Sequence, residues 1–190
     1  MWYNPMLLMD PAVQRELGIS AAFAKRTLVA MSDESMKMNS KVPQAANGKG
    51  ASPEQRRKAE AKMVAYYDRM LNLAVKDLKP RQRFRLHQIT LQSYGAMALY
   101  DPKVAAEVGL SRIQSDSLTK MAADQERLDD VVEDPNASPA QALAAEQRAR
   151  RQSQAVLNSI LTVKQRAKWL AMIGKPVLLT PMHKLSAIKQ

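Results

Sequence analysis

Cysteine is absent from the 190-residue sequence, and histidine occurs only twice. The absence of cysteine excludes disulfide bonds and thiolate metal ligands, and it is compatible with any compartment. Neither His87 nor His183 has a second histidine or a carboxylate at metal-ligand spacing on its own predicted helix. We therefore expect no metal site. We interpret His87 as a partly buried helix residue and His183 as an exposed tail residue.

Catalytic and phosphate-binding signatures are also lacking. The sequence has 6 glycines and no glycine-rich phosphate loop, and its serines have no evident histidine–aspartate partnership. Acidic pairs occur at Asp33-Glu34, Asp129-Asp130 and Glu133-Asp134, near predicted helix C-termini. We interpret them as solvated surface, with a cation-binding patch as the alternative. We expect a protein that is not an enzyme and has no cofactor.

Long hydrophobic runs are missing as well. No stretch approaches the roughly 20 apolar residues that a membrane-spanning helix needs. The apolar start, Met1–Met9, lacks the charged beginning, long apolar middle and cleavage site of a signal peptide. The prediction is a cytoplasmic protein if the reading frame starts at Met1, or a periplasmic protein whose signal peptide has been left out.

Strong helix formers dominate what is present. Hydrophobic residues make up 46% of the chain but aromatic residues only 5%, while methionine occurs 12 times. Alanine, leucine, methionine, glutamine, lysine and arginine all favour helices, whereas the β-branched residues are scattered singly. This composition predicts an all-α protein.

Basic residues exceed acidic ones by 11, and the excess is uneven. Residues 1–95 carry 16 basic and 8 acidic side chains, and residues 96–190 carry 13 and 10. A positive surface favours anionic partners, which include nucleic acids, anionic membranes and acidic protein segments. Nucleic acid is the less favoured partner, because no recognition helix stands out and the basic residues are not interleaved with stacking aromatics.

Two segments near the starts of the two halves match in register. Residues 6–20 and 97–111 are 91 positions apart and share Asp, Pro, Val, Glu, Gly and Ser at equivalent places. The pattern predicts that Asp10 and Asp101 each cap a short helix that begins with proline. Gly18 and Gly109 are expected to end these helices in the left-handed conformation.

Further matches follow in the same order along the chain. They pair 51–55 with 137–141, 71–72 with 157–158, and 78–83 with 161–166, while 178–181 resembles a third, incomplete start. We interpret the series as a tandem duplication of a unit of about 85–90 residues. The predicted organisation is a first helical unit at 1–95, a second at 96–176 and a tail at 177–190.

Each unit is predicted to contain long antiparallel helical hairpins. Apolar residues recur at alternating spacings of three and four, which favours long helices packed at shallow angles. The expected helices span 10–17, 20–37, 53–76 and 80–99 in the first unit, and 102–108, 111–133, 139–160 and 162–173 in the second. A mobile loop is expected at 39–51 and a tight hairpin at 135–137.

The stretches Leu78–Arg83 and Leu161–Arg166 each join one predicted helix to the next. Thr162 is suited to cap the helix that follows it. In the earlier copy Lys79 is a poor cap, but Pro80 sits at the first helical position, where proline is tolerated. We expect the leucines to pack the corner and the glutamines to bond backbone freed by the bend. These structural motif residues are Leu78, Gln82, Leu161, Thr162 and Gln165.

The hinge stretches resemble the LTxxQ motif of the Spy/CpxP family, with lysine in place of threonine in the first copy. Members of that family are small, helical, extracytoplasmic bacterial proteins. They include a chaperone that needs no ATP, a stress-response inhibitor and metal-responsive relatives. The resemblance implies a bent helical hairpin that dimerises into a cradle with a basic concave face. The duplication would also let one chain form by itself what the family forms as a dimer. The histidine-rich ligation of the metal-responsive members is absent here.

The resemblance and the charge together suggest a chaperone or envelope-stress adaptor that binds unfolded or partly folded proteins. Basic side chains would attract clients, and flexible methionines would hold them loosely. The candidate client-binding residues are Arg81, Arg83, Arg85, Arg148, Arg150, Arg151, Met63 and Met70. Core packing is the alternative role for the methionines. The alternative functions are a structural or protein-interaction module of an envelope assembly and a basic helical nucleic-acid-binding protein.

Overall fold

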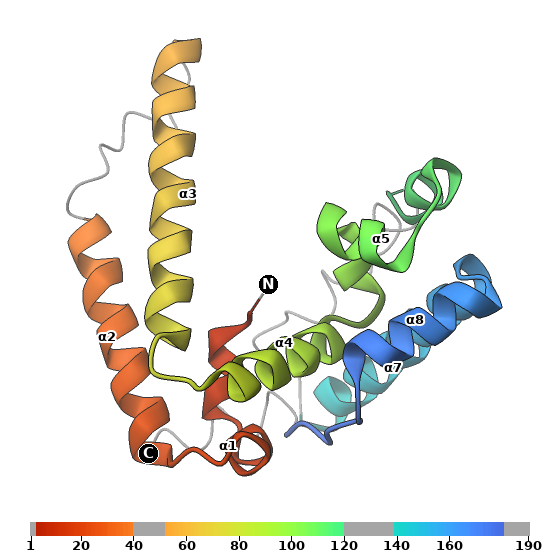
Figure 1. Cartoon of the computed structure of the whole chain (residues 1–190), viewed down its shortest axis with the longest axis horizontal. Helices are drawn as coiled ribbons and strands as arrows, with labels where there is room; N and C mark the ends of the chain where they lie inside the picture. The colour runs from red at the N-terminus through yellow and green to blue at the C-terminus, as the bar shows by residue number, and fades with distance from the viewer. Residues whose placement is uncertain (1–2, 40–51, 120–138, 181–190) are drawn as a thin grey trace. The chain divides into compact units, whose positions relative to one another are not determined.

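The computed structural model describes residues 3–39, 52–119 and 139–180, and every regular element within them is helical (Figure 1). This confirms the predicted all-α fold class. None of the helices in these ranges has both the length and the apolar character needed to cross a membrane. The expected hairpin at 135–137, the last two acidic pairs, most of the expected mobile loop and His183 lie outside the described residues.

The internal contacts of the chain divide it into two compact units, Met1–Leu86 and His87–Gln190. The division falls inside helix α4 (Pro80–Tyr94), earlier than the expected boundary after residue 95. Each unit buries its own apolar side chains, such as Leu8 in the first and Leu99 in the second.

The first unit begins with the 3-10 helix η1 (Pro5–Met9) and the short helix α1 (Pro11–Leu17). The carboxylate of Asp10 accepts a first-turn amide of α1 at 2.7 Å, and proline occupies the first helical position. Gly18 ends the helix with φ of 62° and ψ of 39°. Glycine adopts this left-handed conformation without a steric clash because it has no Cβ atom. The capping roles predicted for this segment are therefore confirmed.

Helices α2 (Ala21–Asn39) and α3 (Pro53–Val75) lie side by side in this unit (Figure 1). Ser52 and Gln55 form a capping box at the start of α3. The 3-10 helix η1 packs against α1 and against both long helices. The unit's buried apolar side chains include Leu7, Leu8, Val13, Leu17, Ala24, Met31, Ala74, Val75 and Leu78.

The second unit repeats these local features. It contains the 3-10 helix η3 (Gly95–Tyr100) and α5 (Pro102–Val108), a helical stretch at 112–119, α7 (Pro139–Ile160) and α8 (Val163–Ile173). Asp101 caps α5, and Gly109 ends it with φ of 83°, as predicted. The 3-10 helix η3 packs against α5 and α7, and α8 packs against α5. Residues 120–133 of the helix expected at 111–133 lie outside the described ranges.

The helix expected at 80–99 is shorter than predicted. It ends at Tyr94, and Gly95, the first residue of the 3-10 helix η3, turns the chain with φ of 54°. The turn is held because the Ala96 amide donates to the Ser153 hydroxyl of α7 at 2.8 Å. Glycine within an apolar helical pattern does not by itself predict a break, because its cost in a helix is only about 1 kcal/mol.

Candidate functional site

The second hinge is organised by Gln165. Its side-chain oxygen accepts the Thr162 amide at 2.9 Å, and the Thr162 hydroxyl accepts the Gln165 amide at 3.3 Å, which completes a capping box at the start of α8. The side-chain nitrogen of Gln165 donates to the carbonyl of Gly109, just past the end of α5, at 2.6 Å. One side chain therefore caps its own helix and anchors the end of another.

Gln114 makes the reciprocal arrangement. It forms a capping box with Ser111, with bonds of 2.9 and 3.3 Å, and donates to the Ile160 carbonyl at the end of α7 at 2.7 Å. The amides of Gln114 and Gln165 also bond each other in both directions, at 2.8 and 3.0 Å. The paired amides therefore join two helix starts to two helix ends.

The role of Gln114 was not predicted. Its stretch, Leu110-Ser111-Arg112-Ile113-Gln114, is the hinge pattern with serine in place of threonine. Serine and threonine are both good N-caps, so a pattern that admitted either residue would have found it. The second unit thus contains two such motifs, and they contact each other through their glutamines.

The first unit has only half of this arrangement. Gln82 accepts the Lys79 amide at 2.8 Å and donates to the carbonyl of Leu17, at the end of α1, at 2.7 Å. Phe23 stands where a second glutamine would be. Its backbone amide donates to the Ser20 hydroxyl at 3.1 Å, and its side chain has no amide to bond another helix end. The hinge glutamines bond main-chain groups in both units, and Leu78 and Leu161 are buried.

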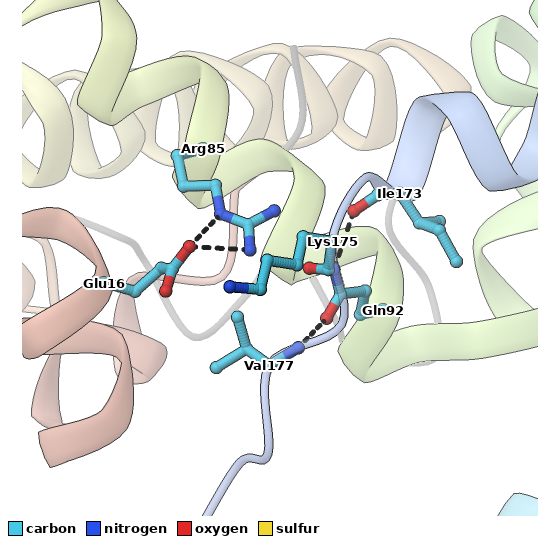
Figure 2. Close-up of polar contacts among 6 residues, drawn as sticks. All are labelled: Glu16, Arg85, Gln92, Ile173, Lys175 and Val177. Carbon is cyan, nitrogen blue, oxygen red and sulfur yellow. Dashed lines mark hydrogen bonds and ion pairs between the residues drawn. The ribbon is translucent and has the colours of Figure 1, made fainter.

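Two of the candidate client-binding arginines have partners inside the first unit. Arg83 donates to the carbonyls of Leu78 and Lys76, each at 2.9 Å. Burial raises the pKa of the Tyr3 phenol, and the positive charge of Arg83 offsets part of that rise. Arg85 forms an ion pair with Glu16 of α1, with N···O distances of 2.8 Å (Figure 2). Their guanidinium groups hold the hinge and α1 in place.

The Arg85→Ala variant should lower the free energy of unfolding of the first unit by about 1 kcal/mol, because the ion pair is partly shielded from water. The Arg85 side chain is only 15% exposed and that of Glu16 34%. Arg81→Ala, at an exposed position four residues earlier, is the matched control and should change stability by less than about 0.5 kcal/mol. Urea unfolding followed by circular dichroism measures both, and equal losses would contradict the assigned role of Arg85.

The remaining candidate arginines lie on two helices, α4 and α7. Arg81 is exposed at the start of α4, and Arg148 and Arg151 are exposed on α7 in the other unit. The side chain of Arg150 lies outside what the structure describes. These arginines therefore belong to two separate units.

The candidate methionines lie on α3, which also exposes other apolar side chains. Met63 is 39% exposed and Met70 is half-buried. Val64 and Tyr67 are more exposed than either methionine, at 56% and 59%. Neither was predicted, because both lie off the stripe of three-and-four spacing that contains Met63 and Met70. Met63, Val64 and Tyr67 therefore form the exposed apolar surface of α3.

Gln92 is a further residue that the sequence pattern did not single out. Its side-chain nitrogen donates to the carbonyls of Ile173 and Lys175, at 2.7 and 2.8 Å, and its oxygen accepts the Val177 amide at 2.9 Å (Figure 2). These bonds fix the extended segment that follows α8. Because the partners lie more than 80 residues away along the chain, no local pattern could reveal them.

The described residues include no group of three or more acidic or histidine side chains that could hold a metal ion. Two hollows occur in the first unit. The one of about 440 Å³ is lined, among described residues, by α2 alone, so it is an open helix face. The one of about 310 Å³ is lined by residues from both α2 and the end of α3.

No protein-family model, curated protein or solved structure matches this chain.

Proposed function

We propose that this chain is a client-binding protein of the Spy/CpxP type, which holds unfolded or partly folded proteins in the periplasm without ATP. The observation that carries the proposal is the exposed apolar surface of α3, formed by Met63, Val64 and Tyr67. Isolated exposed apolar residues are ordinary on protein surfaces, but here three occur within five positions of one helix.

Basic side chains precede this surface along α3. The helix carries five basic and three acidic residues, and Arg56, Arg57, Lys58 and Lys62 come before the apolar positions. Positive charge would raise the encounter rate with acidic segments of a client, and this effect weakens as salt increases. Contacts with methionine and tyrosine would then hold the client loosely, because methionine adapts its shape to different partners.

The paired motifs of the second unit support the family relationship. Family members typically carry two LTxxQ motifs, and the stretches at 110–114 and 161–165 meet through Gln114 and Gln165. The motifs form hydrogen bonds within the unit, so we propose that they stabilise the fold and do not touch the client. Arg81, Arg148, Arg150 and Arg151 remain proposed client contacts, whereas Arg83 and Arg85 are assigned to the fold.

The proposal predicts suppression of client aggregation. At an equimolar ratio and low salt, the protein should reduce light scattering by a reduced, unfolding client without ATP, and less so at high salt. Val64→Ser combined with Tyr67→Ser should weaken client binding roughly tenfold, because this pair would otherwise bury apolar area. Light scattering and fluorescence anisotropy with a labelled client measure the two effects.

Val163→Ser is the matched control, since Val163 is 77% exposed in the other unit and should leave client binding unchanged. An absence of suppression at every salt concentration would overturn the proposal. So would a pull-down that recovers one tight partner and no general clients. A gel shift with nucleic acid at client-like affinity would favour the nucleic-acid alternative instead.

A further inference from the structure

The 310 Å³ cavity of the first unit lies between α2 and the C-terminal end of α3. Phe23, Ala30 and Leu73 supply its apolar walls, and Arg26, Thr27, Lys76 and Asp77 supply its polar groups. Its volume is at the lower end of the range for small-molecule sites, which are typically apolar hollows with a few placed polar groups.

Thr27 gives this cavity a hydroxyl group that makes no hydrogen bond to another described residue. The residue is only 8% exposed. Within the described part of the chain, no side-chain oxygen or nitrogen is both sealed from solvent and without a partner. The Thr27 hydroxyl is therefore reachable from solvent, so a water molecule or a bound ligand can form a hydrogen bond with it.

The charged groups of the cavity form no ion pair with other described residues. Among the described residues, neither Arg26 nor Lys76 has a carboxylate within 4.0 Å, and Asp77 has no cation within that distance. The described lining of the cavity therefore has a net positive charge of one, from two cations and one carboxylate. This balance favours a single negative charge on a bound molecule.

Other residues stand at the corresponding positions of the second unit. Offsets of 91 and 83 residues pair Arg26 with Ser117, Thr27 with Leu118, Lys76 with Ser159, and Asp77 with Ile160. Phe23 corresponds to Gln114, whose side-chain nitrogen donates to the Ile160 carbonyl. Leu118 is 1% exposed. The charges and the Thr27 hydroxyl are thus particular to the first unit.

We propose that this cavity binds a small organic anion, namely a carboxylate on a short apolar body. The carboxylate would accept hydrogen bonds from Arg26 and Lys76 at the rim, and the apolar body would lie against Phe23 and Leu73. Thr27 would donate its hydroxyl inside the cavity. Asp77 opposes the anion, so its neutralisation should tighten binding. This site is separate from the exposed apolar surface of α3 on which client binding depends.

The test is a titration of the isotopically labelled full chain with hexanoate and with its neutral amide, followed by methyl NMR. At low salt hexanoate should bind roughly fivefold more tightly than hexanamide, because two exposed cations contribute. Shifts should concentrate on the methyl groups of Thr27, Ala30 and Leu73, and Leu118 should serve as the internal control in the second unit.

Three variants test the roles assigned to Thr27, Arg26 and Asp77. Thr27→Leu installs the residue that the second unit already tolerates, so it should fold and should abolish the shifts by filling the cavity. Arg26→Ser should weaken hexanoate binding roughly threefold and leave hexanamide unchanged, whereas Asp77→Asn should strengthen hexanoate binding by a similar factor. Equal binding of acid and amide, no shifts up to about 10 mM of either, or unchanged binding in folded Thr27→Leu would each overturn the proposal.

Discussion

The Gln165→Ala variant is expected to lower the free energy of unfolding of the second unit by about 4 kcal/mol. The substitution removes the bond to the Thr162 amide, the bond to the Gly109 carbonyl and both bonds to Gln114. Each hydrogen bond contributes about 1 kcal/mol net, and the partners left behind are partly buried. Urea unfolding followed by the fluorescence of Trp169 measures the effect, because this tryptophan is buried in α8 of the same unit.

Two further variants separate the local and the tertiary parts of this effect. Gln165→Glu keeps an oxygen for the capping box but has no N–H to donate to Gly109, so it should lose about 2 kcal/mol. Gln147→Ala, at an exposed position of α7, should change stability by less than about 0.5 kcal/mol. Wild-type stability in Gln165→Glu would show that the bond to Gly109 contributes nothing.

The Gly174→Ala variant is expected to destabilise the second unit by about 4 kcal/mol. Gly174 has φ of 64° and ψ of −157°, a region that is almost restricted to glycine. A Cβ atom there would lie 2.5–2.6 Å from the side-chain amide of Gln88, which is only 9% exposed. The backbone strain and the steric clash act together, because the buried amide has little room to move aside.

Gly109→Ala is the matched control within the same unit. Its φ is also positive, but the nearest atom to an added Cβ is the flexible end of Lys168 at 3.6 Å. Its cost should therefore be only the conformational one, about 1–2 kcal/mol. Trp169 fluorescence again reports both variants. Equal losses would show that the contact with Gln88 is absent. Combining Gly174→Ala with Gln88→Ala should recover part of the loss if the clash is real.

The helix starts and stops could be predicted because capping is local. The roles of Asp10, Asp101 and Thr162 depend on amides within three residues of each cap, and those of Gly18 and Gly109 on a backbone conformation that glycine favours. The break at Gly95 was not predicted, because it depends on Ser153, which is 57 residues from Ala96. The tandem duplication remains a prediction from the sequence offsets, although the paired starts and hinges have similar local geometry.

The candidate site was harder to predict than the helices. Periodicity identified Met63 and Met70 but not the more exposed Val64 and Tyr67, because these two lie off the stripe of three-and-four spacing that it detects. Charge clusters identified Arg83 and Arg85, whose partners include carbonyls in the hinge and Glu16, 69 residues before Arg85. An excess of arginine indicates a basic surface, but it does not distinguish a free guanidinium from one already engaged.

The sequence by itself determined an all-α chain, the ends of most helices and the two hinge stretches. These features follow from propensities and caps that act over a few residues. Only the tertiary structure decided that Gln165 pairs with Gln114, that Gln92 holds the segment after α8, and that Arg85 holds α1 while Arg81 stays exposed. The reason is physical: a side chain at the end of a helix can reach several backbone groups, and packing between distant segments determines which of them lies within hydrogen-bonding distance.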